Sequence, residues 1–466
     1  MPKGVATDIV AVDSTAVGGQ DRSPCFAVGP SGSPAPSVGF TSPPPHSVNA
    51  FREPSLVNQP PEPDEPSSMP VAQLKLRPGR HHPFLARHPW VHAHSLVDTG
   101  ERLRVGDVVD VTSHDGRFVG RGLINPAGKL RVRLYGFDES APIDAAMWRR
   151  RLDAAISRRG ALIESQDPNA GCRWVHSEGD QLSGLVVDRY ADVASVQFNA
   201  AAVFRHRQTI LNYLGERPEI ERVHWRIDPR TARAEGLEAS QGWAGGASGD
   251  DVAGVDYTAN RFSWTADPAG GQKTGGYLDQ RDNHAAAARW MPGRRLLDVC
   301  CYHGGFALAA IRAGAASVTA VDSSLAALEA ADAATRRNGL PEIDFLKADC
   351  FDLLADLGRS GETYDAVILD PPRFAASRNQ VDGALKAYRR LNTAAIRVLN
   401  PGGVLVTCSC SGRVSTDDFL GMLRDVSRTV GRDVLTAEVR GAPADHPVAV
   451  TCPETRYLKC VIATVP

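Results

Sequence analysis

Two cysteines near the end of the chain are the residues that suggest chemistry most directly. In the stretch VTCSCSG, Cys408 lies within an apolar run, and Cys410 stands at its end between two serines. A buried cysteine is often a plain apolar side chain, which suits Cys408 better than Cys410. A thiolate at position 410 could instead add to carbon 6 of a cytosine, after which carbon 5 could attack a methyl donor. For Cys410, core packing and nucleophilic chemistry both remain open from the residues alone.

Metal binding and disulfide formation are the other roles that these cysteines could have. Five cysteines could gather along one edge of a sheet: Cys300, Cys301, Cys350, Cys408 and Cys410. The sequence has no C-x-x-C pair, and structural zinc sites favour such short spacings, so we predict no metal. A disulfide within C-S-C is sterically poor, and an odd total of nine cysteines does not indicate a disulfide framework. A reducing cytoplasm is therefore the expected location.

The elements that must position Cys410 are the strands and helices of residues 267–466. Strand-like runs such as LLDVCCY, SVTAVD and TYDAVILDPP alternate with helical stretches such as LAALEAADAATRRNG. This alternation predicts an α/β domain with a parallel, doubly wound sheet. Such sheets bind ligands beyond the carboxyl ends of their strands. Four expected strand ends carry a carboxylate, namely Asp298, Asp322, Asp349 and Asp370.

These carboxylates favour a nucleoside ligand. Asp322, after the second strand, can accept both ribose hydroxyls, and Asp349 can accept an adenine amino group, although either could simply cap a helix. The turn CCYHGGF has two glycines, Gly304 and Gly305, that let the chain approach a ligand closely. It lacks the third glycine of G-x-G-x-x-G, the pattern that cradles a pyrophosphate. S-adenosylmethionine, whose cationic end suits Asp298, is therefore favoured over a nicotinamide dinucleotide.

The stretch DPPRF follows the fourth strand of the predicted sheet. Its two prolines hold a rigid turn whose carbonyls and acid can face a planar base, although a purely structural turn is the alternative. Asp370 could hold N3 or N4 of a cytosine while Cys410 adds to the ring. Methylation of a ring nitrogen, such as guanine N7, needs no thiol and stays open as a second possibility.

Three regions are expected before the α/β domain. Residues 1–70 are rich in Pro, Ser and Gly and are predicted to be a disordered extension, with Met69 a possible true start. Residues 71–141 show short alternating strands separated by glycines, which predicts a small β-barrel. Residues 142–266 mix helical and strand patterns and are expected to form an α+β middle domain.

The predicted barrel is the region whose side chains suit RNA. The net charge of −2 gives no general attraction to nucleic acid, so binding requires a local basic patch. Basic groups beside aromatic rings can pair with phosphates and stack on bases, although a solvated surface is the alternative. The basic residues are Lys75, Arg77, Arg80, Arg87, Arg131 and Arg133.

Several strings together resemble one family, the PUA-domain-containing class I methyltransferases of large-subunit ribosomal RNA, methyltransferase I type, which make 5-methylcytidine in 23S rRNA. The strings lie between Leu74 and Pro466 and read RHPWV, GLVVDRY, GGQKTGGYLDQRDNH, GGFA, VDSS, DPPRF, CSCSG and ADHPV. The resemblance implies a PUA barrel, a Rossmann-like domain that uses S-adenosylmethionine, and Cys410 as nucleophile. It also implies ribosomal RNA, free or in a subunit precursor, as partner, and a homodimer is possible.

The resemblance also assigns residues to the cofactor. It implies contacts from Asp298, Gly304, Asp322, Asp349 and Asp370, and it implies that Asp279, Gln280 and Arg281 help to close the pocket. Two departures stand out: the turn reads CYHGG instead of a Ser/Thr-flanked aromatic, and Arg373 stands where many RNA cytosine methyltransferases carry a second, product-releasing cysteine. An RNA-binding protein without catalysis is a further alternative.

Overall fold

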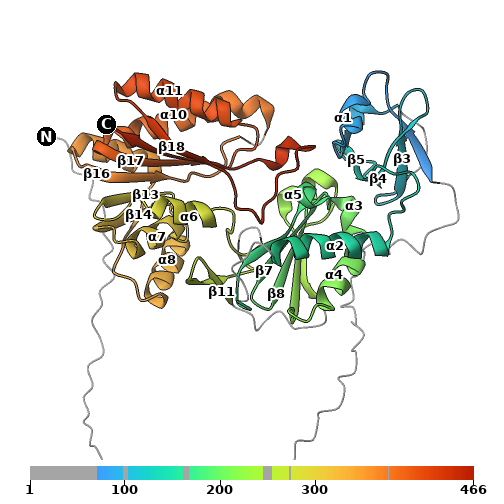
Figure 1. Cartoon of the computed structure of the whole chain (residues 1–466), viewed down its shortest axis with the longest axis horizontal. Coiled ribbons are helices and arrows are strands. Elements are labelled where there is room, and N and C mark those ends of the chain that lie inside the picture. Colours follow the sequence, from blue (N-terminus) through green and yellow to red (C-terminus); the bar gives the residue numbers. More distant parts are fainter. Residues whose placement is uncertain (1–70, 98–102, 161–166, 245–253, 272–273, 376) are drawn as a thin grey trace, which may run out of the picture. The chain divides into compact units, whose positions relative to one another are not determined.

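The computed structural model describes residues 71–97, 103–160, 167–244, 254–271, 274–375 and 377–466 (Figure 1). Residues 1–70, for which the sequence predicts disorder, lie outside these described ranges. The described residues all belong to one unit that spans residues 51–466. No helix among them is long and apolar enough to cross a membrane.

A five-stranded sheet forms the first part of the described chain. Its elements are β1 (Ala72–Lys75), α1 (His82–Leu85), β2 (Trp90–His92), η1 (Ala93–Ser95), β3 (Val108–Thr112), β4 (Phe118–Ile124) and β5 (Leu130–Gly136). The strand order is β1-β3-β4-β5-β2, and only the β1–β3 pair is parallel. Alternating residues such as Val109, Val111 and Val132 are fully buried and form the core of this sheet.

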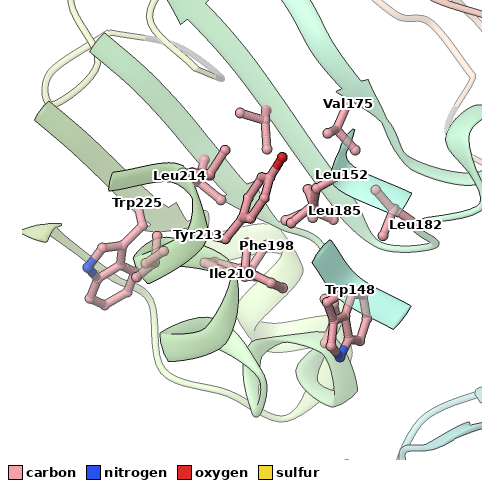
Figure 2. Packing of buried hydrophobic residues seen from close by; sticks show 14 of the residues in the cluster. Trp148, Leu152, Val175, Leu182, Leu185, Phe198, Ile210, Tyr213, Leu214 and Trp225 are labelled. Atoms are coloured by element: carbon pink, nitrogen blue, oxygen red, sulfur yellow. The ribbon is translucent and has the colours of Figure 1, made fainter. Parts of the chain in front are cut away.

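A second five-stranded sheet forms the middle of the chain. Its elements are α2 (Ala145–Gly160), β6 (Cys172–His176), η2 (Ser177–Asp180), β7 (Leu185–Tyr190), β8 (Val193–Phe198), α3 (Ala201–Phe204), α4 (Arg207–Gly215), β9 (Arg222–Ile227), α5 (Pro229–Glu235) and β10 (Ser240–Ala244), followed by the hairpin β11 (Val255–Ala259) and β12 (Phe262–Ala266). The sheet has the order β10-β9-β8-β7-β6. Trp148 and Leu152 of α2 are buried with side chains of α4 and of the strands (Figure 2).

The last part of the chain is a seven-stranded sheet covered by helices. Its elements are α6 (Arg281–Ala288), β13 (Arg295–Val299), α7 (Gly305–Arg312), β14 (Ser317–Asp322), α8 (Leu325–Arg337), β15 (Asp344–Lys347), α9 (Cys350–Ser360), β16 (Tyr364–Leu369), η4 (Arg378–Gln380), α10 (Val381–Arg397), β17 (Leu399–Ser409), α11 (Thr416–Val430), β18 (Leu435–Arg440), η5 (Pro453–Thr455) and β19 (Lys459–Val465). The order is β15-β14-β13-β16-β17-β19-β18. Strands β13 to β17 pair in parallel, whereas β19 is antiparallel to both of its neighbours.

Helices lie on both faces of this sheet, as the alternating pattern predicts. Figure 1 shows α7 and α8 on one face and α10 and α11 on the other. On β13, Leu296 packs in the core on the α7 side, whereas Leu297 packs in the core on the α10 side. Asp298 has the same strand parity as Leu296 and therefore points toward α7. On β17, Cys408 is fully buried in the α7-side core, as its packing interpretation expects.

Candidate active site

A cavity of about 800 Å³ lies at the carboxyl ends of the parallel strands. Its volume is in the range of pockets that enclose small organic ligands. Its walls come from the segments that follow β13, β14, β15, β16 and β17, and from the β11–β12 hairpin. Residues before and within α6 and residues before β19 complete the walls. Eight residues that the sequence predicts for the site line this cavity: Asp279, Gln280, Arg281, Gly305, Asp322, Asp349, Asp370 and Cys410.

Asp322 ends β14 and holds the loop that follows β13. One carboxylate oxygen accepts the backbone N–H of Tyr302 at 2.9 Å, and the other accepts that of Ser324 at 2.9 Å. Within this loop Cys300 and Tyr302 have φ values of +61° and +49°, which L-residues rarely adopt. The Asp322 carboxylate therefore fixes a strained loop. Its remaining lone pairs can still accept hydroxyl groups from a ligand in the cavity.

Asp298 lies behind the cavity wall and is fully buried. Neither of its oxygens has a well-formed hydrogen bond among the described residues, although the backbone of Ala307 is oriented toward it. Burial, followed by the nearby charge of Asp370, raises the pKa of Asp298 to about 8. The group is therefore largely a neutral acid at pH 7, and a cation placed next to it would favour its ionised form.

Asp349 caps a helix, as the simpler interpretation of this residue expects. Strand β15 ends at Lys347, so Asp349 lies just beyond the strand and is the N-cap residue of α9. Its Oδ1 accepts the backbone N–H groups of Phe351 at 2.8 Å and Asp352 at 3.2 Å. The residue also borders the cavity, so capping does not exclude contact with a ligand.

The two glycines of the turn after β13 are favoured by internal packing and backbone conformation, which differs from the reason expected from the sequence. A Cβ atom at Gly305 would lie 2.2 Å from the ring of His284. At Gly304, where φ is +76°, a Cβ atom would lie 2.9 Å from Leu308. Gly305 borders the cavity but Gly304 does not. Close contact with the His284 ring therefore requires glycine at position 305, and the positive φ favours glycine at position 304.

The residues before α6 connect the cavity to other parts of the chain. The Gln280 side chain donates to Asp370 at 3.0 Å, and Asp279 accepts the hydroxyl of Tyr457 at 2.8 Å. Arg281 donates to the carbonyl of Gly171 and lies 3.3 Å from the buried carboxylate of Asp445. The guanidinium of Arg281 thus ties the cavity wall to the middle of the chain.

Cys410 directly follows β17 and is half-buried at the cavity wall. The next residue, Ser411, is fully buried. Its hydroxyl accepts the backbone N–H of Ala375 at 3.2 Å and lies 3.0 Å from the hydroxyl of Tyr388. These contacts connect the turn that carries Cys410 to α10 and to Ala375, the residue directly after the DPPRF stretch.

Aromatic rings cover a further part of the wall, and sequence reasoning did not single out the two tyrosines among them. Tyr277 packs edge-on against Tyr302 with ring centroids 4.8 Å apart, and Tyr302 stacks on His303 at 3.7 Å. Burial, with smaller effects of nearby acidic groups that include Cys410, raises the pKa of Tyr277 to about 12, so its hydroxyl stays protonated. The aromatic residues in the stretches KTGGYLDQ and CCYHGG could have predicted this part of the wall from the sequence. Such rings can stack on planar ligands.

Two parts of the chain match known domain families. Residues 74–137 match the PUA-like domain, and residues 238–445 match the S-adenosylmethionine-dependent methyltransferase family. "Ribosomal RNA large subunit methyltransferase I" of Shewanella denitrificans is 37% identical over 396 residues, which cover 84% of this chain and 99% of the relative. The Klebsiella pneumoniae protein of the same name is 36% identical over 83% of this chain and 96% of its own length. The chain belongs to the ribosomal RNA large subunit methyltransferase I family.

Solved structures support the fold of this methyltransferase I family member. A SAM-dependent methyltransferase from Streptococcus mutans matches with a TM-score of 0.72 at 18% identity, over 85% of this chain and 100% of the other. The methyltransferase SMU.776, solved in complex with SAH, matches with a TM-score of 0.73 and the same identity and coverage. The predicted fold class, a PUA-like domain followed by a Rossmann-like methyltransferase domain, is confirmed.

S-adenosylmethionine is the cofactor of this methyltransferase I family member, as predicted. The cavity suits such a ligand, because it offers acceptors for ribose hydroxyls at Asp322 and rings for a planar base. A sulfonium or ammonium charge bound near the buried carboxyl of Asp298 would favour the ionised form of that carboxyl. Which of these residues touches the cofactor remains a prediction.

The basic residues predicted to bind RNA fall into two groups in the PUA-like domain. Lys75, Arg77, Arg80 and Arg87 are exposed. Arg131 instead donates to the carbonyl of Pro126. Arg133 is only 11% exposed, and its guanidinium pairs with Glu178 and Glu235. The two residues of β5 are therefore occupied by internal contacts. The four exposed residues remain candidates for phosphate contacts, although Arg77 also donates from Nε to the carbonyl of Leu96 at 2.9 Å.

Proposed function

We propose that this methyltransferase I family member forms 5-methylcytidine in 23S ribosomal RNA through a covalent adduct with Cys410. The observation that supports this proposal is that Cys410 and Asp370 line the same cavity as the carboxylates suited to the cofactor. A nitrogen methyltransferase has no need of a thiol at this position, because a ring nitrogen already carries a lone pair that can attack a methyl group.

Each step uses a residue at the carboxyl edge of the sheet. The Cys410 thiolate bonds to carbon 6, and the electrons of the C5–C6 double bond make carbon 5 nucleophilic. S-adenosylmethionine, when bound, supplies the electrophilic methyl group. The Asp370 carboxylate accepts a hydrogen bond from N4 or from protonated N3 and so orients the ring. Carbon 5 takes that methyl group. Loss of the carbon 5 proton to solvent then re-forms the C5–C6 double bond, and the S–C6 electron pair returns to sulfur and frees Cys410.

The expected partner is ribosomal RNA of the large subunit, bound in part by the PUA-like domain. The exposed basic residues Lys75, Arg77, Arg80 and Arg87 are proposed to contact phosphates. None of the eight cysteines among the described residues forms a disulfide. Action in the cytoplasm is a further part of the proposal. A homodimer is a further part of the proposal that oligomer measurements can test.

The decisive experiment compares Cys410→Ala with Cys408→Ala on ribosomal RNA lacking the modification. Cys410→Ala should lower methyl transfer by about 10³-fold or more yet keep affinity for S-adenosylhomocysteine, because the thiol acts on the base. Cys408→Ala removes a sulfur two residues away that is fully buried in the core. It should cost about 1–2 kcal/mol of stability and retain activity. Radiolabelled methyl incorporation and equilibrium dialysis measure the two properties.

The same preparations separate 5-methylcytidine from a nitrogen-methylated product. Mass spectrometry of nucleosides from treated RNA, and from a strain lacking the gene, should show 5-methylcytidine gained and lost respectively. Turnover by Cys410→Ala at the wild-type rate, with a methylated guanine as product, would replace this proposal with the nitrogen-methylation alternative. RNA binding without methyl incorporation by the wild-type protein would favour a non-catalytic role.

A further inference from the structure

Lys459 is a buried cation next to the proposed nucleophile. It is the first residue of β19 and is only 2% exposed, which is unusual for a lysine. In the antiparallel ladder between β17 and β19 it lies opposite Ser409, the residue that immediately precedes Cys410. The sheet register therefore places this side chain beside the turn that carries the thiol.

The ammonium group of Lys459 joins two segments of the cavity wall. Its Nζ donates to the carbonyl of Ser411 at 2.7 Å and to the carbonyl of Tyr457 at 2.9 Å. No carboxylate lies within ion-pair distance of it among the described residues. A buried ammonium held by carbonyl dipoles alone pays a large desolvation cost. If this position only filled space in the core, an apolar side chain would stabilise the fold better than a lysine.

The electrostatic surroundings link Lys459 to the thiol. Burial lowers the pKa of Lys459 to about 8, and the interaction that opposes this most strongly is that with the Cys410 thiolate. Coupling between two groups is reciprocal, so the ammonium favours the thiolate by as much as the thiolate favours the ammonium. Arg373 and Asp418 also act on Lys459, and Tyr277 and Tyr388 interact with Cys410. The Asp370 carboxylate acts on the same two tyrosines and lines the same cavity.

We propose that Lys459 is a positioning residue for Cys410, whose ammonium fastens the Cys410–Ser411 turn and stabilises the thiolate at the cavity wall. The thiol proton leaves to solvent, and Lys459 keeps its own protons and does not touch the base. This role deepens the proposed function, because it matters for catalysis only if Cys410 is the nucleophile. Sequence spacing gives no hint of it, since 49 residues separate the two positions.

The test is the pH dependence of Cys410 alkylation by iodoacetamide, read by mass spectrometry of the peptide that contains Cys410. In this reaction the thiolate forms an S–C bond and iodide leaves, so the rate follows the thiolate fraction. The wild-type midpoint should lie below ~8.5, the value of an ordinary thiol. In Lys459→Met the midpoint should rise by about one pH unit, with a roughly tenfold slower reaction at pH 7. Lys347→Met, at an exposed lysine of the same sheet, should leave it unchanged.

Two results would overturn the role of Lys459. One is a wild-type midpoint at or above ~8.5, which needs no variant and so does not depend on how the mutant folds. The other is an alkylation midpoint equal to that of the wild type in Lys459→Met or Lys459→Gln, provided that the variant still unfolds in a cooperative thermal transition. Either result leaves the proposed function intact if Cys410→Ala is inactive. If Cys410→Ala were active, the proposed function would be wrong, but the alkylation results for the wild type and the Lys459 variants would stand.

Discussion

Two regions of this protein satisfy their buried charges in different ways. In the middle sheet, Arg173 donates to both oxygens of the fully buried Asp188 at 2.6 and 2.8 Å. At the carboxyl edge of the last sheet, Asp298 has no well-formed hydrogen bond among the described residues, and the Lys459 ammonium donates hydrogen bonds to two backbone carbonyls. Complete pairing is expected where charges hold a structure, and incomplete pairing is expected where groups await a ligand or tune a reactive atom.

The buried ion pairs of the middle sheet are connected by hydrogen bonds to the ADHPV segment near the end of the chain. Arg159 donates to both oxygens of Asp180 at 2.6 and 2.7 Å and also to the carbonyl of Asp445. Asp445 accepts the backbone N–H of Arg173 at 3.0 Å. These bonds satisfy the fork of each guanidinium in bidentate geometry. Their role is to fix the segments behind the cavity, and not to supply a reactive group.

The largest effect on stability is expected from breaking a complete pair. Asp188→Asn should lower the free energy of unfolding by about 3–5 kcal/mol, because it leaves the Arg173 guanidinium buried without its counter-charge. Urea denaturation followed by tryptophan fluorescence measures the loss. Asp256→Asn, which changes an exposed carboxylate paired with Arg337, is the control and should cost less than about 1 kcal/mol. A loss of similar size in both variants would contradict the contrast between the two regions.

Asp298→Asn should raise the free energy of unfolding, whereas Asp188→Asn should lower it. The pKa of Asp298 is about 8 in the folded protein against 3.8 ordinarily, so the folded state binds more protons between these values. Stability from this group is present below about pH 4 and is lost as the pH rises toward 8. The variant cannot ionise, so it should equal wild type near pH 4 and exceed it by about 1–3 kcal/mol near pH 8.

Urea unfolding of Asp298→Asn at pH 5, 6.5 and 8 checks this prediction, with Asp344→Asn, at an exposed carboxylate of β15, as control. If the difference in unfolding free energy between Asp298→Asn and the wild type stayed constant with pH, ionisation of Asp298 would not be the cause of the difference. The same variant should bind S-adenosylmethionine a few-fold more weakly at pH 8, because it lacks the charge that a sulfonium favours. Greater stability together with weaker binding is the combination expected of a functional group.

Much of the last domain could be predicted from sequence, because its signals are local. Runs of Val, Ile and Leu mark each parallel strand, and parallel strands bring their carboxyl ends to one edge. This reasoning places Asp322, Asp370 and Cys410 around one cavity without any coordinates. Burial on the two faces also follows from strand alternation, which explains why Cys408 is a core residue and Cys410 is not.

Contacts between distant segments could not be predicted, because they depend on register and on side-chain reach. The bond between Asp279 and Tyr457 spans 178 residues, and the one between Gln280 and Asp370 spans 90. The pairing of Arg133 with acids of the middle sheet likewise removes a residue that its basic character had assigned to RNA. Residue type predicts what a side chain can do, whereas only the fold decides which partner occupies it.

The smallest expected effect separates two roles that Asp349 combines. Asp349→Ala removes the N-cap of α9 and should lower the free energy of unfolding by about 1 kcal/mol. Asp349→Ser keeps a cap oxygen, so its stability should stay within about 0.5 kcal/mol of wild type, but it lacks a carboxylate for an adenine amino group. If the residue also binds the cofactor, both variants should weaken S-adenosylhomocysteine binding about equally in isothermal titration. Wild-type affinity in the stable Ser variant would mean that Asp349 is a helix cap and nothing more, and the cavity would then resemble the middle sheet at this one position.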